Sequence, residues 1–204
     1  YAPATRPEGL PETMWIKGGF AAHREYVGAL GVYAGEVRFF EEIAPLYELS
    51  RPVSYFGLAQ SEPSQGIVAL EDLRARSVVF TRATSPMSVE RAQSGLEALA
   101  ALHGQSWRDE RPTRLGLGPV LPNASERILQ DWFAALPDFF SAPRGFAAPV
   151  ALHRPDQLRA AVSVYRAKLQ REALCVVHGD AHIGNAYVER EGRVGFVDWQ
   201  TVAF

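Results

Sequence analysis

The apolar residues in the first third of the chain follow two periods, one helical and one extended. Between Phe20 and Ala44 they recur every three or four residues, which predicts helical structure. Glycines weaken this run and favour two helices rather than one, and Pro45 ends it. Three other segments predict strands: Met14–Lys17, Pro52–Gln60 and Gln65–Glu71. The last two would form a hairpin, so this part is predicted to be rich in strands.

After Leu73 the pattern becomes mainly helical. Ser88 could cap a helix, and Ser125 and Pro155 are placed to open two more. The apolar spacing predicts that the inward face of the first of these helices consists of Val89, Ala92, Leu96, Leu99 and His103. The C-terminal end returns to predicted strands: Ala173–Val177, Ala186–Val188 and Val194–Val197. A turn over residues 191–193 would join the last two strands into a hairpin.

Composition places the chain among soluble globular proteins. It has 204 residues, of which 47% are hydrophobic and 22% charged, with a formal net charge of -2. This balance excludes disordered and collagen-like chains and argues against nucleic acid as a partner. No apolar run reaches the ~18 residues of a membrane span, so we expect no membrane partner. The single cysteine, Cys175, fits a reducing compartment, and we expect a cytoplasmic protein. Oligomeric state is not predicted.

The densest polar cluster in an apolar setting is His178-Gly179-Asp180-Ala181-His182-Ile183-Gly184-Asn185. It lies between two predicted strands, which would hold the loop rigidly. Asp198 follows Asn185 by thirteen residues, at the end of another strand. The predicted hairpin would therefore bring Asp180, Asn185 and Asp198 around one small space.

These side chains suit Mg²⁺ and phosphoryl transfer. Mg²⁺ prefers oxygen ligands, and Asn185 and Asp198 can supply them. Asp180 would then be free to orient and deprotonate a hydroxyl nucleophile. The cation for nucleotide phosphates would be Lys17, at the end of its strand, held by an ion pair with Glu36. The alternatives are a solvated Lys17 and a register in which Glu41 or Glu42 takes the place of Glu36.

The same residues resemble those of the aminoglycoside phosphotransferase and choline kinase-like superfamily. The loop His178–Asn185, followed by Val197-Asp198-Trp199-Gln200, resembles the catalytic loop and metal-binding segment of that superfamily. Met14–Lys17 resembles its nucleotide-binding strand, and Leu70-Glu71-Asp72-Leu73 resembles the hinge that holds adenine through its backbone. The endings Asp-Trp-Gln and Glu-Asp-Leu are also similar to the ecdysteroid kinase-like branch. That branch usually has Trp in place of His182, so the branch stays open.

The resemblance implies an α+β, protein kinase-like two-lobed fold. We expect a partial N-terminal nucleotide-binding lobe of antiparallel strands over residues 1–70, a hinge at 71–73, and a mainly helical catalytic lobe over 74–204. The chain begins without Met, lacks the strands and phosphate loop that usually precede Lys17, and ends directly after the metal-binding segment. We therefore expect a fragment lacking both ends of the family's fold, which alone would be weak or inactive.

The function that this resemblance implies is ATP-dependent transfer of the γ-phosphate to a hydroxyl of a small molecule. Asp180 would be the catalytic base, Asn185 and Asp198 the Mg²⁺ ligands, and Lys17, Glu36, Glu71 and Leu73 the nucleotide-binding residues. The acceptor is not predicted. One competing hypothesis is a nucleotide-binding pseudokinase without turnover. Another is a metal-dependent hydrolase that uses His178, Asp180 and His182 as ligands, and a third is a tight turn in which the polar groups only cap the backbone.

Overall fold

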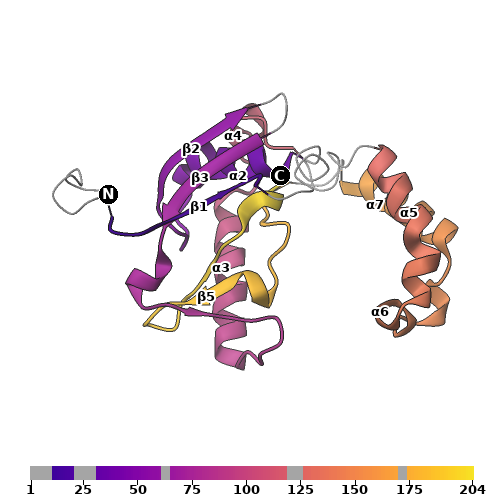
Figure 1. Cartoon of the computed structure of the whole chain (residues 1–204). Coiled ribbons are helices and arrows are strands. Elements are labelled where there is room, and N and C mark those ends of the chain that lie inside the picture. The colour runs from indigo at the N-terminus through magenta and orange to yellow at the C-terminus, as the bar shows by residue number, and fades with distance from the viewer. Residues whose placement is uncertain (1–10, 21–30, 61–64, 119–125, 170–173) are drawn as a thin grey trace. The chain divides into compact units, whose positions relative to one another are not determined.

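The protein forms two compact units in this computed structural model (Figure 1), which describes residues 11–20, 31–60, 65–118, 126–169 and 174–204. The first unit comprises residues 1–117 and 174–204, and the second comprises residues 118–173. The predicted small lobe, the hinge and the polar loop therefore all lie in the first unit. The predicted boundary between two lobes falls inside this unit and stays a prediction.

The first unit contains an antiparallel three-stranded sheet with the order β1-β3-β2 (Figure 1). Its strands are β1 (Met14–Gly18), β2 (Ser54–Gln60) and β3 (Gln65–Glu71), which confirms the three strands predicted in this part of the chain. Lys17 pairs with Val68 in the centre of the sheet, and Met14 pairs with Glu71 at the end of β3. The predicted turn of the hairpin, residues 61–64, lies outside the described residues.

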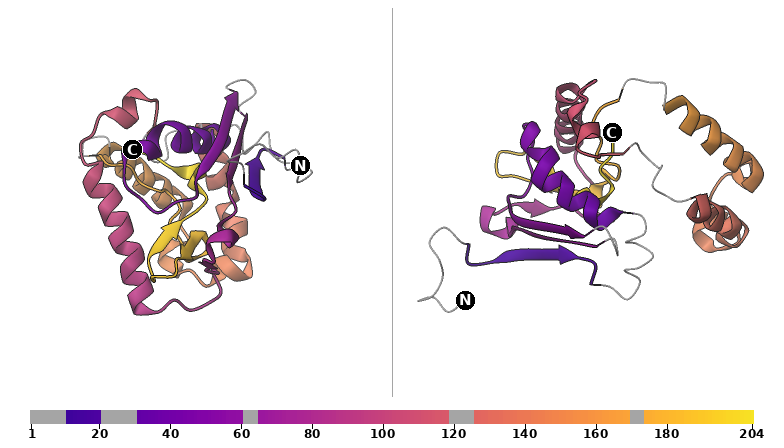
Figure 2. Two further views of the ribbon diagram at one scale, coloured as in Figure 1. Left: turned by 90° about the vertical axis from the view of Figure 1, so that its left-hand side faces the viewer. Right: turned by 90° about the horizontal axis from the view of Figure 1, so that it is seen from above.

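The helical run predicted between Phe20 and Ala44 is described only from residue 31 onward. Helix α2 (Val32–Arg38) packs against β2 and β3, and the views of Figure 2 show it alongside the sheet. A π-helical turn (Phe39–Ile43) and a 3₁₀ turn (Ala44–Leu46) continue it. The wider π turn adds a residue, so that Phe39 and Phe40 are both buried. Pro45 sits in the last turn, where the predicted run ends.

A second antiparallel sheet holds the polar loop of the first unit. Its strands, in the order β4-β5-β6, are β4 (Val79–Phe80), β5 (Ala186–Val188) and β6 (Val194–Phe196). The predicted C-terminal hairpin is therefore confirmed. The predicted strand at Ala173–Val177 is described from residue 174 and contributes only one bridge, between Val177 and Ala203. Strand β4 was not predicted, because two half-exposed residues carry no alternation that marks a strand.

Helix α3 (Val89–Gln105) packs against β6 with a face that includes only part of the predicted one. Val89 and Leu96 are 78% and 68% exposed, whereas Gly95 and Leu102 are buried. A Cβ added to Gly95 would lie 3.5 Å from the Val194 side chain, so the small residue allows a close approach. The prediction was right for Leu99, which packs against the core, and wrong for Val89 and Leu96, because the helix meets β6 at the small Gly95. Ser88 caps the helix as predicted, accepting from the backbone N–H of Arg91.

The core of the first unit joins both sheets, α2, α3 and the C-terminal segment. Trp199 is 1% exposed, and its ring stacks on Phe39 with 4.0 Å between the ring centroids. Phe204 is buried in the same cluster. The apolar residues that follow Asp198 therefore fix that position against α2. A short helix, α4 (Arg111–Arg114), follows α3 in the same unit.

The second unit is helical in its described part. It contains α5 (Glu126–Ser141), α6 (Pro143–Phe146), a 3₁₀ turn (Val150–Leu152) and α7 (Pro155–Leu169). Pro155 begins α7 as predicted, and α5 packs against both α6 and α7. The predicted cap at Ser125 lies outside the described residues.

Candidate active site

A cavity of about 450 Å³ in the first unit brings together six of the residues singled out in the sequence. They are Lys17, Glu36, Glu71, Leu73, Asn185 and Asp198. We call it the Lys17 cavity. Two aromatic side chains that sequence reasoning did not assign to a site, Trp15 and Phe80, also line it and are half exposed. Their only sequence signal was their place in short apolar segments, which does not distinguish a cavity wall from a core.

Lys17 forms the centre of a three-residue ionic cluster. It reaches the cavity from β1, and its Nζ lies 2.9 Å from both carboxylate oxygens of Glu36, which comes from α2. The same ammonium donates to Oδ1 of Asp198. The Glu36 side chain is only 4% exposed, whereas that of Lys17 is 36% exposed. The register with Glu36, rather than Glu41 or Glu42, is therefore the one that the fold adopts.

Burial and charge shift the pKa values of this cluster. Burial alone would lower the pKa of Lys17, but the carboxylates of Glu36 and Asp198 outweigh it, so that pKa is raised from its ordinary value. Burial also raises the pKa of Glu36, and Lys17 and the backbone N–H of Trp199 offset this only in part. Lys17 thus stays fully charged, and it is the group that allows Glu36 to be buried.

The polar loop is fixed by the side chain of His178, a residue that is buried with only 1% of its surface exposed. Its Nε2 donates to the carbonyl of Val197 at 3.0 Å, and its Nδ1 accepts from the backbone N–H of Asp180 at 3.3 Å. The ring therefore carries its proton on Nε2, and burial lowers its pKa. His178 is therefore a structural hydrogen-bonding residue, and both of its nitrogens are engaged.

Gly179 lets the chain turn directly after His178. Its φ of +83° lies in the left-handed region, and a Cβ at this position would lie 2.1 Å from the carbonyl oxygen of Thr201. Only glycine fits such a close backbone approach without strain. The Thr201 hydroxyl in turn donates to the His178 carbonyl at 3.2 Å. The loop is thereby held against the segment that follows Asp198.

Asn185 connects the loop to the hairpin. Its Nδ2 donates to Oδ2 of Asp180 at 3.3 Å and to the Asp180 carbonyl at 3.1 Å. The backbone carbonyl of Asn185 accepts from the backbone N–H of Val197, the residue before Asp198, at 2.9 Å. The three oxygen-bearing side chains are therefore neighbours, as the predicted hairpin required.

Asp180 and Asp198 lie in different surroundings. Asp180 does not line the Lys17 cavity but sits beside it, with its side chain 48% exposed and 3.8 Å from Nε2 of His182. Asp198 lines the cavity with a left-handed backbone (φ 65°, ψ 60°), and its side chain is 29% exposed. The exposed Asp180 carboxylate can accept a proton from a bound molecule, whereas the Asp198 carboxylate, which contacts Lys17, can bind positive charge.

Glu71 and Leu73 lie where β3 ends, at the edge of the cavity. The Glu71 carboxylate accepts from the N–H of Val53 at 3.0 Å and lies 3.1 Å from Nε of Arg76. Leu73 is 2% exposed and begins a 3₁₀ turn that Asp72 caps through the N–H of Arg74. Both residues are thus held rigidly. Sequence reasoning did not single out Arg76, because its partners Glu71 and Glu189 lie on different segments of the chain.

No group of three His, Cys, Asp or Glu side chains within the described residues could hold a metal ion by itself. For the alternative set of His178, Asp180 and His182, the reason is local, because both nitrogens of His178 are already engaged. A site built by Asn185 and Asp198 would rely on further oxygens from a bound ligand or water. In the part of the chain that the structure describes, no helix is both long and apolar enough to cross a membrane.

Comparison with known proteins places these residues in a family. No curated protein shows significant similarity to the chain. Among solved structures, the GDP complex of a point mutant of aminoglycoside 2′-phosphotransferase-IIIa is similar, with 13% identity and a TM-score of 0.46. That similarity covers 92% of this chain and 60% of the other, so the chain spans less than two thirds of the solved protein. The sequence model of the phosphotransferase enzyme family matches residues 34–204, a range that includes Glu36 and the polar loop but not Lys17. The chain therefore belongs to the phosphotransferase enzyme family.

Proposed function

We propose that this chain carries the nucleotide site of a kinase that transfers the γ-phosphoryl group of ATP to a hydroxyl of a small molecule. The observation that carries the proposal is the Lys17 ammonium between Glu36 and Asp198, in a cavity that Asn185 also lines. A charged amine held by two carboxylates is placed to contact phosphate oxygens. Family membership supports the phosphotransferase chemistry.

The lining of the cavity suits both parts of a nucleotide. It contains the polar side chains of Lys17, Asn185 and Asp198, and apolar and aromatic side chains such as those of Trp15 and Phe80. The polar groups would contact the phosphates, and the apolar groups would cover the base. Glu71 and Leu73, at the end of β3, would border the base.

The oxygen donors fit a hard divalent cation. The Asp198 carboxylate already binds one positive charge, the Lys17 ammonium. The Nδ2 of Asn185 donates to Asp180, so the amide oxygen of Asn185 is the atom that would bind a cation. Asn185 and Asp198 would hold Mg²⁺, with phosphate oxygens and water completing the ligand set. When bound, Mg²⁺ neutralises charge on the phosphates.

Asp180 would act on the acceptor. The acceptor oxygen forms a bond to the γ-phosphorus while the bond from that phosphorus to the β–γ bridging oxygen breaks, and the hydroxyl proton passes to the Asp180 carboxylate. ADP leaves with the bridging oxygen. The Asp180 side chain is 48% exposed, so it can meet an acceptor that arrives from solvent. Asn185 orients it through the hydrogen bond between Nδ2 and Oδ2.

The first test is calorimetric titration of ATP into the chain with and without Mg²⁺, on the unchanged protein, Asp198→Asn and Asp180→Asn. We expect Mg²⁺-dependent binding that Asp198→Asn weakens strongly. Asp180→Asn is the matched control, because it removes a neighbouring carboxylate that does not line the cavity, and it should leave binding nearly unchanged. Equal binding by Asp198→Asn and the unchanged protein would remove Asp198 from the metal site.

The second test separates a kinase from a nucleotide-binding pseudokinase. Transfer of labelled γ-phosphate to a panel of hydroxyl-bearing small molecules is measured with the chain and with the complete gene product that contains it. We expect transfer by the complete gene product that Asp180→Asn abolishes. Nucleotide binding by the complete gene product without transfer to any acceptor would favour the pseudokinase, and transfer by Asp180→Asn at the unchanged rate would refute the assignment of the base.

A further inference from the structure

Arg76 lies where the two sheets of the first unit meet, and it contacts both of them. Its Nε lies 3.1 Å from Oε1 of Glu71, at the end of β3 in the first sheet. Its Nη1 lies 3.6 Å from Oε1 of Glu189, directly after β5 in the second sheet. The side chains of Glu71 and Glu189 are only 13% and 12% exposed. One guanidinium thus joins two largely buried carboxylates from segments far apart in the sequence.

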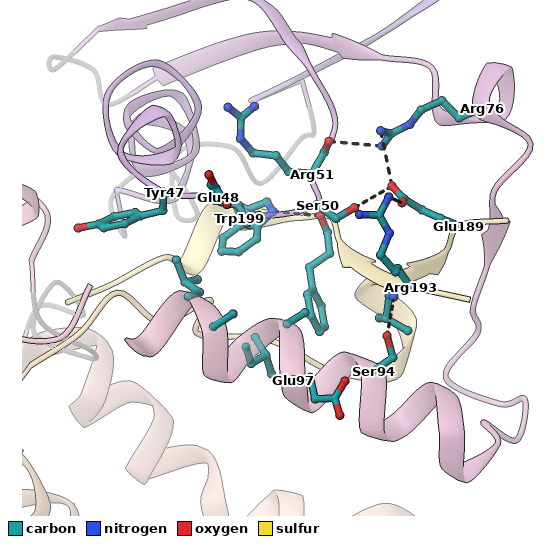
Figure 3. A pocket seen from close by; sticks show the side chains of 17 residues that line it. Tyr47, Glu48, Ser50, Arg51, Arg76, Ser94, Glu97, Glu189, Arg193 and Trp199 are labelled. Carbon is teal, nitrogen blue, oxygen red and sulfur yellow. Dashed lines mark hydrogen bonds and ion pairs between the residues drawn. The ribbon is translucent and has the colours of Figure 1, made fainter. Parts of the chain in front are cut away.

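Further contacts fix the guanidinium in this position. Its Nη2 donates to the Tyr187 hydroxyl at 3.2 Å and to the Arg51 carbonyl at 3.4 Å, and its charge lies over the Tyr187 ring. The Ser50 hydroxyl lies 3.0 Å from the Tyr187 hydroxyl and donates to Glu189 at 2.8 Å. Figure 3 shows Arg76 reaching the Arg51 backbone and Glu189, with Ser50 meeting the same carboxylate. A planar guanidinium can serve all these acceptors at once, which an ammonium cannot.

Each of the two segments that Arg76 joins forms one part of the wall of the Lys17 cavity. Glu71 is itself a lining residue, and its second carboxylate oxygen accepts from the N–H of Val53. Glu189 directly follows β5, the strand that begins after Asn185, and the paired strand β6 leads to Asp198. Arg76 does not line this cavity but lines a second one of about 670 Å³, drawn in Figure 3. It therefore holds the cavity walls together from outside.

We propose that Arg76 is a positioning residue that sets the hairpin carrying Asn185 and Asp198 against the end of β3, and so tunes the affinity for the Mg²⁺–nucleotide complex. The inference rests on the proposed function. Without the guanidinium, Glu71 and Glu189 would lose their common partner, and the hairpin would be free to shift relative to the hinge. The Mg²⁺ ligands would then be misplaced relative to a base held by the other wall.

The test compares Arg76→Met, which keeps an apolar stem, with Arg76→Lys, which keeps the charge but loses the fork. Arg190→Met is the matched control, because Arg190 comes from the same hairpin and donates to the Ser77 hydroxyl, directly after the same 3₁₀ turn, but forms no ion pair with Glu71 or Glu189. ATP is titrated calorimetrically with and without Mg²⁺. We expect Arg76→Met to weaken Mg²⁺–ATP binding about three- to tenfold, Arg76→Lys to recover part of this, and Arg190→Met to change nothing.

A merely structural role would give a different result. Partial unfolding lowers the number of binding sites per chain and affects ATP with and without Mg²⁺ alike, whereas misplaced Mg²⁺ ligands raise the dissociation constant for Mg²⁺–ATP most. Equal losses with and without Mg²⁺, an unchanged dissociation constant in Arg76→Met, or an equal loss in Arg190→Met would each overturn the inference while leaving the proposed function standing. Failure of both the unchanged chain and the complete gene product to bind ATP would overturn both.

Discussion

Lys17 is the residue whose removal tests the site and the fold together. In Lys17→Met the apolar stem remains, but the Glu36 carboxylate, 4% exposed, loses the cation that it contacts at 2.9 Å. Breaking a buried ion pair on one side costs about 3–5 kcal/mol in other proteins. The Lys17 side chain is 36% exposed, so solvent screens the pair, and we expect a loss of ~1–3 kcal/mol in the free energy of unfolding.

The loss should depend on pH in a defined direction. Burial already raises the folded-state pKa of Glu36 above its unfolded value, and removal of Lys17 removes the main influence that lowers it. An acid whose folded pKa is raised stabilises the fold when protonated, below its unfolded pKa, and this stability is lost as pH rises through the folded pKa. The difference between Lys17→Met and the unchanged protein should therefore be smaller at about pH 5 than at about pH 8.

The assay is urea unfolding followed by circular dichroism at both pH values. Lys168→Met makes the same chemical change at an exposed position and should alter stability by less than about 0.5 kcal/mol. Adding Glu36→Gln to Lys17→Met should restore most of the loss, because Gln removes the unpaired charge and can still accept from the Trp199 N–H. Equal midpoints for Lys17→Met and Lys168→Met, or no recovery in the double variant, would refute the reasoning.

Three further predictions concern the support of the polar loop. Ser106 is fully buried, accepts from the N–H of Val176 at 2.9 Å and donates to the Leu102 carbonyl. Ser106→Ala should therefore lower the free energy of unfolding, measured in urea, by about 1–3 kcal/mol. A loss no larger than that of Ser88→Ala, at an exposed helix cap, would contradict this. Gly179→Ala places a Cβ 2.1 Å from the Thr201 carbonyl oxygen, so it should lower the free energy of unfolding by more than the ~1 kcal/mol of a left-handed alanine alone. Thermal unfolding would show this as a clear fall in the melting temperature. An unchanged melting curve would show that the segment relaxes. Burial lowers the pKa of His178, so stability should be lost as pH falls below about 6.5, and His178→Gln should flatten this slope between pH 7 and 5, measured by thermal unfolding; an equally steep slope would assign it to other groups.

Local patterns were sufficient for most of the site. The strand that carries Lys17, the helix that carries Glu36 and the hairpin that carries Asn185 and Asp198 were all predicted, because each depends on short-range periodicity and turn residues. The resemblance of the polar loop then indicated a phosphotransferase, and the family match agrees. The roles of Asp180, Glu71 and Leu73 stay predictions.

Features that depend on which surfaces meet could not be predicted. The inward face of α3 includes Gly95 and Leu102 but not Leu96, because β6 approaches the helix at Gly95, which has no side chain. Strand β4 exists because β5 offers it a partner, and its two residues carry no pattern of their own. The π turn after Arg38 widens the helix where Phe39 stacks on Trp199, a residue from the other end of the sequence.

The sequence by itself thus determined the chemistry of the site: a lysine strand, a helix glutamate, and a loop and hairpin rich in oxygen donors. Tertiary structure alone decided how these groups are used. It placed the Lys17 ammonium on both Glu36 and Asp198, left Asp180 beside the cavity and not in it, and set Arg76 between two sheets. The physical reason is that residue types and local periods act over a few residues, whereas these ion pairs form only when segments up to 181 residues apart are packed together.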